Sequence, residues 1–87
     1  MSWYVYVARC ADGSLYCGWT NDLDKRLAAH EAGTGARYTA SRRPVTYAAT
    51  WPMADRAAAM REEARIKRLD RAQKLALLAT AAPPAPR

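Results

Sequence analysis

The chain has 87 residues, which favours one domain with a modest core, and its net charge of +6 favours a polyanionic partner, nucleic acid first. Its two cysteines are too few for a disulfide scaffold, and its single histidine leaves no Cys/His cluster with zinc-ligand spacing. No apolar run reaches the ~18 residues of a membrane span, and the N-terminus lacks the basic segment and cleavage site of a signal peptide. We therefore expect a cytoplasmic protein that is neither a membrane protein nor a disulfide-rich secreted one.

The N-terminal fifth of the chain predicts a β-hairpin. Residues 3–10 (WYVYVARC) are rich in aromatic and β-branched side chains and predict a strand, and residues 14–20 (SLYCGWT) predict its partner. The dipeptide Asp12-Gly13 between them is a strong short-range hairpin signal.

The length of the hairpin loop decides whether Tyr6 and Tyr16 lie together, because side chains alternate between the faces of a sheet. A two-residue turn would place the two phenols on opposite faces. A three-residue loop over residues 11–13 places them on one face and sets Tyr6 opposite Gly18, where the missing side chain leaves room for the ring. We predict the three-residue loop, because such loops favour a left-handed residue where Gly13 stands.

After the hairpin, the pattern predicts a helix over about residues 22–32, capped by Thr20 or Asn21. One stripe of this helix follows the i, i+3, i+4, i+7 spacing and comprises Leu23, Arg26, Leu27 and His30. Arg26 and His30 are therefore expected beside buried leucines rather than out in solvent.

The middle of the chain predicts a loop, a strand and a second helix. Residues 33–43 (GTGARYTASRR) predict an arginine-rich loop, and residues 45–51 predict a third strand. The second helix is expected over residues 55–68, with Asp55 as its cap and Glu63 at the border of its apolar stripe. That stripe comprises Ala57, Met60 and Ala64.

The C-terminal part predicts a third helix and a tail. The helix begins at a capping-box-like segment, residues 70–73 (DRAQ). Its apolar positions are Ala72, Leu75 and Leu78. Residues 81–87 predict a disordered tail, so the single domain is expected to cover residues 1–80.

Two tripeptides and three later side chains resemble the signature of the GIY-YIG nucleases. Residues 4–6 (YVY) and 16–18 (YCG) correspond to the two motifs that name the family. Arg26 and His30, four residues apart on the first predicted helix, match the family's Arg and His, and Glu63 matches its metal-binding glutamate. The chain is most similar to the small stand-alone bacterial members.

The resemblance implies an α+β fold with a three-stranded antiparallel sheet flanked by three helices in the order β-β-α-β-α-α, which agrees with the element order above. It also implies an endonuclease that hydrolyses DNA phosphodiester bonds, DNA rather than RNA, with structure-directed or low sequence specificity. The implied cofactor is Mg²⁺ or Mn²⁺, held by Glu63. The implied catalytic residues are Tyr6, Tyr16, Arg26, His30 and Glu63.

These residue types suit phosphodiester hydrolysis. Glu63 can hold a Mg²⁺ that keeps several waters, and Arg26 can clamp a phosphate oxygen. Tyr6 or Tyr16 can take a proton from the attacking water if a nearby cation or metal lowers the phenol pKa from its usual value near ~10. His30 can orient a water or relay a proton.

Each of these residues also has a purely structural interpretation. The tyrosines can be cross-strand aromatics, Arg26 can lie along the leucine stripe, and His30 can bond a carbonyl near the helix end. Glu63 can pair with Lys67 one turn later.

Further side chains are predicted to contact nucleic acid through phosphates or base stacking, and a solvated helix face is the alternative for the basic ones. They are Arg37, Tyr38, Arg42, Arg43, Arg65, Lys67, Arg68 and Lys74.

The family signature is incomplete at three points. Tyr4 stands where the family name has Gly, and Cys17 stands where it has Ile. Many active members carry an Asn after the glutamate, whereas the only Asn here is Asn21. The alternative function is therefore a nucleic-acid-binding module with the same fold and weak or no turnover. A third possible function is that of a protein-interaction domain with an incidental basic surface.

Overall fold

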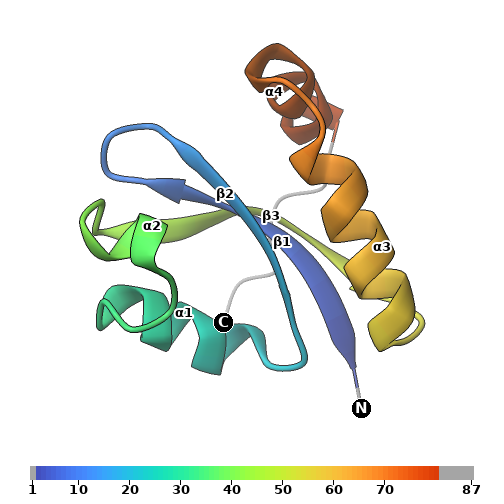
Figure 1. Cartoon of the computed structure of the whole chain (residues 1–87), viewed down its shortest axis with the longest axis horizontal. Helices are drawn as coiled ribbons and strands as arrows, with labels where there is room; N and C mark the ends of the chain where they lie inside the picture. Colours follow the sequence, from blue (N-terminus) through green and yellow to red (C-terminus); the bar gives the residue numbers. More distant parts are fainter. Residues whose placement is uncertain (1, 81–87) are drawn as a thin grey trace.

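The computed structural model describes residues 2–80, and the predicted tail over residues 81–87 lies outside the described residues. The sheet has three antiparallel strands in the order β2-β1-β3 (Figure 1). The strands are β1 (Trp3–Cys10), β2 (Leu15–Thr20) and β3 (Val45–Met53). The helices are α1 (Leu23–Glu31), α2 (Arg37–Ala40), α3 (Arg56–Lys67) and α4 (Arg71–Thr80). The predicted α+β fold and element order are confirmed, with the short α2 as an addition.

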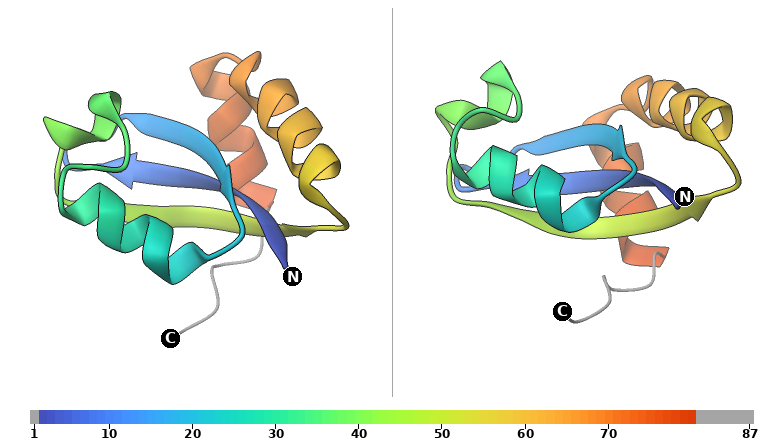
Figure 2. Two further views of the ribbon diagram at one scale, coloured as in Figure 1. Left: turned by 60° about the horizontal axis from the view of Figure 1, so that its bottom comes forward. Right: turned by 90° about the horizontal axis from the view of Figure 1, so that it is seen from below.

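Helices cover both faces of the sheet. Figures 1 and 2 show α1 and α2 on one side of it and α3 and α4 on the other. The central strand β1 is therefore buried on both faces over residues 5–8. The core under α1 comprises Tyr6, Ala8, Cys10 and Val45. The core under α3 comprises Val5, Val7, Cys17, Ala59 and Ile66. No helix within residues 2–80 is long and apolar enough to cross a membrane.

The hairpin closes through the predicted three-residue loop. Tyr6 pairs with Gly18 and Ala8 pairs with Tyr16, so the two phenols share a face and their ring centroids lie 6.5 Å apart. Gly13 has φ +83°, in the left-handed region, and its N–H donates to the Cys10 carbonyl at 3.0 Å. The register on which the phenol pair depends is thus confirmed.

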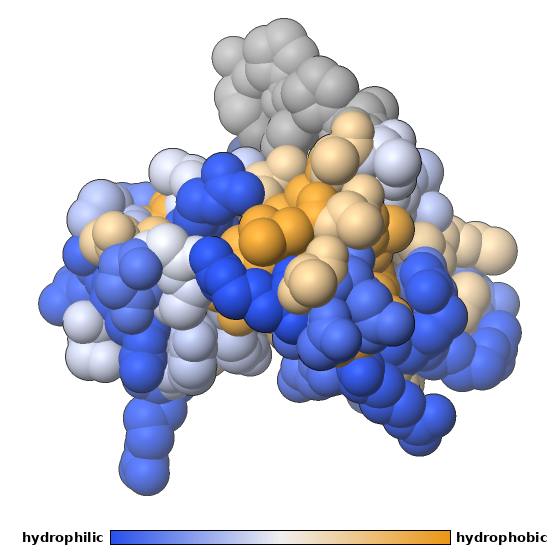
Figure 3. Space-filling view, turned by 90° about the horizontal axis from the view of Figure 1, so that it is seen from above, coloured by the Kyte–Doolittle hydropathy of each residue, from blue (hydrophilic) through white to orange (hydrophobic). Residues whose placement is uncertain are grey.

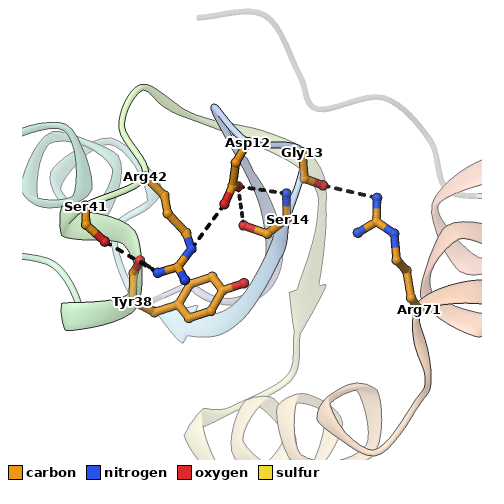
Figure 4. A network of polar contacts seen from close by, with 7 residues as sticks. All are labelled: Asp12, Gly13, Ser14, Tyr38, Ser41, Arg42 and Arg71. Carbon is orange, nitrogen blue, oxygen red and sulfur yellow. Dashed lines mark hydrogen bonds and ion pairs between the residues drawn. The ribbon is translucent and has the colours of Figure 1, made fainter.

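The hairpin loop is held from two sides. Arg42, which follows α2, forms an ion pair with Asp12 at 3.2 Å, and its carbonyl accepts the Ala11 N–H at 2.9 Å. From α4, Arg71 donates to the Gly13 carbonyl at 3.3 Å. Figure 4 shows the two arginines reaching the loop from opposite sides. Both helical layers are therefore tied to the same turn.

Two local predictions around α1 are wrong. Asp22, rather than Thr20 or Asn21, caps α1, because its carboxylate accepts the Lys25 N–H at 3.0 Å. The predicted loop over residues 33–43 contains the four-residue helix α2, whose side chains bond to α1. The sequence pattern of such a short helix is weak, so its tertiary partners decide that it forms.

The apolar stripe predicted for the second helix is also wrong. Ala59 and Ile66 of α3 are fully buried against the sheet. The predicted stripe residues Ala57, Met60 and Ala64 are exposed, Met60 by 46%. Alanines occur on several faces of this helix, so the shape of the sheet surface selects the packed face.

The N-terminal caps of α3 and α4 follow the sequence, but the packing of α4 does so only in part. Asp55 accepts the Ala58 N–H at 2.8 Å, and residues 70–73 form a reciprocal capping box. Leu78 packs on the core together with Leu77, whereas Leu75 is 39% exposed and Ala72 is exposed. Figure 3 shows an apolar area, with hydrophilic side chains below it and to its left, on the face that carries α4.

We expect Gly18→Ala to displace the Tyr6 phenol, because a Cβ at this position would collide with the Tyr6 hydroxyl and ring. The variant should lose about 1–3 kcal/mol of unfolding free energy in urea titrations, as overpacked cores do, and the Tyr6 ring resonances should shift.

Gly13→Ala is the matched control. It faces open space but has φ +83°, so it should cost about 1–2 kcal/mol while leaving the Tyr6 resonances in place. Unchanged Tyr6 resonances in Gly18→Ala would show that the ring does not lie across β2.

Candidate active site

A buried phenol, that of Tyr6, lies at the centre of the candidate site. Its ring crosses β2 over Gly18 and is fully buried. Its hydroxyl accepts a hydrogen bond from Arg26 Nε at 3.0 Å and lies 2.8 Å from His30 Nε2. The strand thus supplies the phenol, and α1 supplies an arginine and a histidine one turn apart on the face that covers it.

The network continues from His30 toward α2. His30 Nδ1 lies 2.8 Å from Thr39 Oγ1, which also donates to the Ala36 carbonyl at 3.1 Å. Both His30 and Thr39 are fully buried. Within residues 2–80, no buried side-chain nitrogen or oxygen lacks a hydrogen-bond partner. The cluster is therefore a satisfied polar network inside the fold.

Burial dominates the electrostatics of this network. It raises the pKa of Tyr6 to about 12, although the hydrogen bond and charge of Arg26 act in the opposite direction. Burial, together with the Arg26 charge, lowers the pKa of His30 from its ordinary value of 6.5. At neutral pH, Tyr6 and His30 are thus uncharged, and Arg26 carries the positive charge of the cluster.

Tyr16 is the phenol that reaches the surface. It is partly exposed, and its ring packs edge-on against His30 with centroids 5.4 Å apart. On the outer side it stacks on Tyr38 of α2, with centroids 6.0 Å apart, and Lys67 Nζ lies 5.9 Å from its ring centroid. Tyr16 therefore connects the buried network to the exposed edge strand β2.

Glu63 lies on α3 and contacts this cluster only through Lys67. Its Oε2 lies 3.6 Å from Lys67 Nζ, and its side chain is 19% exposed. Its backbone carbonyl faces the Cys17 thiol at 3.9 Å, which places this turn of α3 against β2. Glu62 instead forms a bidentate bond to Arg65, at 2.7 and 2.8 Å, so Glu63 is the carboxylate on the β2 side.

The structure joins four of the five predicted catalytic residues in direct contact and leaves the fifth, Glu63, outside that cluster. Tyr6, Tyr16, Arg26 and His30 form one cluster on the α1 face. Glu63 belongs to the α3 face, and Lys67 is its link to Tyr16 around the edge of β2.

One carboxylate with few other protein ligands is a donor set that fits Mg²⁺ or Mn²⁺, which keep waters and take phosphate oxygens. Within residues 2–80, no three His, Cys, Asp or Glu side chains are grouped to hold a metal ion. Burial and the neighbouring Glu63 raise the pKa of Cys17 to about 12, so its thiol is protonated at neutral pH.

Several predicted nucleic-acid contacts are engaged within the protein. Arg43 donates to the Ala40 and Glu31 carbonyls, at 3.0 and 3.2 Å, and so ties α1 to α2. Arg42 covers the Tyr38 ring at 4.0 Å while pairing with the hairpin loop.

Other predicted contacts face outward. Arg37 and Arg68 are exposed, and Lys74 lines a cavity of about 170 Å³ with Tyr38 and Arg71. Arg65 is paired with its neighbour Glu62, and Lys67 with Glu63.

Sequence reasoning missed two members of the network, Thr39 and Tyr47. The Tyr47 hydroxyl donates to the Leu23 carbonyl at 2.6 Å, and its ring centroid lies 5.1 Å from that of Tyr6. Strand alternation could have placed Tyr47 on this face once the sheet register was known. No local pattern distinguishes Thr39, because its role depends on the approach of α2 to α1.

Curated proteins of similar sequence bear the name UPF0213. One from Xanthomonas axonopodis pv. citri is 53% identical over 76 residues, which cover 87% of this chain and 74% of that protein. One from Halobacterium salinarum is 51% identical over 74 residues, which cover 85% of this chain and 96% of that protein.

Solved structures extend the likeness to three dimensions. The solution NMR structure of a UPF0213 protein from Bacillus halodurans has 43% identity and a TM-score of 0.60, covering 91% of this chain and 84% of that chain. The solution NMR structure of a protein from E. faecalis has 45% identity and a TM-score of 0.64, covering 92% of this chain and 85% of that chain.

The family model of the GIY-YIG catalytic domain matches residues 2–76, which include both tyrosine motifs and all five predicted catalytic side chains. With this match, the chain belongs to the GIY-YIG family, whose domains are generally nucleases.

Proposed function

We propose that this protein is a divalent-metal-dependent endonuclease that hydrolyses DNA phosphodiester bonds with structure-directed or low sequence specificity. The position of Arg26 carries the proposal. Its guanidinium lies against the phenols of Tyr6 and Tyr16, and Arg26 also borders a cavity of about 250 Å³ between the end of β2 and the start of α1. A phosphate that enters there meets a positive charge already held in place.

Tyr16 is the better candidate for the base. It is partly exposed, whereas Tyr6 is fully buried and has a pKa of about 12. Two cations lie near Tyr16 and can meet the substrate phosphate there: Arg26 contacts the Tyr16 side chain, and Lys67 Nζ lies 5.9 Å from its ring centroid.

In the proposed reaction, Tyr16 acts as the phenolate: its oxygen takes a proton from water while the water oxygen bonds to phosphorus. The bond from phosphorus to the leaving oxygen breaks, and the electron pair stays on that oxygen. Tyr6 holds the Arg26 side chain in place, and Arg26 neutralises the charge that develops on the phosphate.

Glu63 would hold the Mg²⁺ or Mn²⁺ ion. When bound, such an ion neutralises charge on the phosphate and on the leaving oxygen. Lys67 lies near both Glu63 and Tyr16, so its ammonium group can pair either with the Glu63 carboxylate or with the substrate phosphate. The basic side chains on α2, α3 and α4 would contact the flanking DNA backbone.

The second candidate is a nucleic-acid-binding module without turnover. The ion pair between Glu63 and Lys67, at 3.6 Å, favours it, because a paired carboxylate is less available to a metal. In that case the basic surface binds nucleic acid and Glu63 only supports α3.

Cutting should require Glu63 and not its neighbour. We expect Glu63→Gln to lower cleavage of supercoiled plasmid and branched DNA about 100-fold or more, since losing the metal removes several kcal/mol of transition-state stabilisation. Cleavage is measured with Mg²⁺ and with Mn²⁺. Glu62→Gln is the matched control and should cut like wild type, because Glu62 pairs with Arg65. Equal cutting by wild type and Glu63→Gln would rule out the enzyme.

Binding should depend on salt through the cations near Tyr38. We expect Lys74→Gln to reduce the slope of log K against log salt by about 1, the value for one lost phosphate contact. Arg56→Gln is the control, since Arg56 covers Trp19 at the other end of β2 and its loss should leave the slope unchanged. Fluorescence anisotropy with labelled DNA from low to moderate salt measures both, and equal slopes in the two variants would contradict the prediction.

Acidification should destabilise the fold through His30. Its folded pKa lies below 6.5, so below about pH 6.5 the unfolded chain binds a proton that the folded chain does not. The contribution to unfolding free energy is therefore full above about pH 6.5 and falls as the pH decreases. The groups that face the imidazole are Arg26, Tyr6, Tyr16 and Thr39.

The chain has a single histidine, so urea titrations at several pH values between about 7.5 and 5.5 isolate this effect. His30→Gln should show a flatter dependence of unfolding free energy on pH than wild type. Parallel profiles for the two proteins would contradict a neutral, buried His30.

A further inference from the structure

The buried hydroxyl of Thr39 has no part in the proposed chemistry, yet it ends the hydrogen-bond chain that begins at Arg26. The chain runs from Arg26 Nε to the Tyr6 hydroxyl, on to His30, and then to Thr39 and the Ala36 carbonyl. Tyr6, His30 and Thr39 are all fully buried. Each proton in the chain therefore needs an acceptor within it.

Counting these protons gives the chain a direction. Thr39 Oγ1 has one proton, which it donates to the Ala36 carbonyl at 3.1 Å, so it accepts from His30 Nδ1 at 2.8 Å. A neutral imidazole with a proton on Nδ1 has a bare Nε2, which accepts the Tyr6 hydroxyl proton at 2.8 Å. The Tyr6 oxygen then keeps its lone pairs for the Arg26 N–H at 3.0 Å.

The other tautomer does not satisfy the site. With the proton on Nε2, both His30 and Arg26 would donate to the Tyr6 oxygen. The Tyr6 hydroxyl proton would then lose His30 Nε2 as its acceptor. A buried donor without a partner costs about 1–3 kcal/mol, so the Nδ1–H tautomer is favoured.

We propose that Thr39 is a positioning residue that fixes His30 as the Nδ1–H tautomer, and thereby turns the Tyr6 hydroxyl toward His30 and its lone pairs toward Arg26. The four-residue helix α2 thus has a defined task, which is to present one hydroxyl to the far nitrogen of His30. The expected effect of Thr39 on cutting rests on the proposed function, because Thr39 acts through Arg26, which meets the phosphate. The assignment of the His30 tautomer does not rest on the proposed function.

Thr39→Val tests this role, because valine keeps the shape of threonine and lacks the hydroxyl, and Thr39→Ser is the conservative control that keeps it. The single histidine makes the imidazole nitrogen shifts of protein labelled with ¹⁵N-histidine unambiguous. Wild type and Thr39→Ser should show a protonated Nδ1 and a bare Nε2 at neutral pH. Thr39→Val should show a mixture of tautomers or a protonated Nε2.

Cutting supplies the second measurement. Thr39→Val should lower the rate constant for cleavage about 10–100-fold, the loss typical of removing a partner that orients a functional histidine, while Thr39→Ser restores it. The dissociation constant for DNA should stay unchanged, because Thr39 is fully buried.

Three results would overturn the role of Thr39. They are a protonated Nε2 in wild type, an unchanged tautomer in Thr39→Val, and a changed tautomer with undiminished cutting. The first can be measured on wild type even if Thr39→Val does not fold. If wild type does not cut DNA at all, the proposed function fails, and the nitrogen shifts alone then decide whether Thr39 sets the tautomer.

Discussion

The ring of Tyr6 lies across Gly18, and most of the site depends on that contact between β1 and β2. A slip of one residue would move the side chains of β2 to the other face of the sheet. Burying a phenol under α1 also creates a demand for hydrogen-bond partners, since an unpaired buried hydroxyl is costly. Arg26 and His30 meet that demand, so the contacts that bury Tyr6 also hold a guanidinium between two phenols. Stability and the candidate chemistry therefore share the same hydrogen bonds.

The candidate site continues around the edge of the sheet instead of staying on one face. Tyr16 belongs to the α1 face and Glu63 to α3, and Lys67 lies near both of them around β2, the edge strand of the sheet within residues 2–80. The hairpin loop contacts the helices on both sides of the sheet. Arg42 bonds the loop to the α2 side and Arg71 bonds it to α4. These two contacts hold the two helical layers in place relative to each other at the end of the sheet.

Much of this arrangement could be predicted from local patterns. The Asp-Gly pair with a glycine in the left-handed position indicated the loop length, and the loop length placed Tyr6 and Tyr16 on one face. The cap of α3 at Asp55 and the capping box at residues 70–73 could also be predicted, because a cap is made by residues close in sequence. The packed face of α3 could not be predicted, because its alanines form several similar faces and contact with the sheet selects one of them.

By itself, the sequence determined the order of the elements, the register of the hairpin and the residue types of the site, because turns, caps and strand alternation act over a few neighbouring residues. Only the tertiary structure decided which carboxylate faces β2, that Tyr6 is buried while Tyr16 reaches the surface, and that Thr39 meets His30. These features depend on how helices pack across a sheet, and a side chain nine or more residues away finds its partner only when that packing forms.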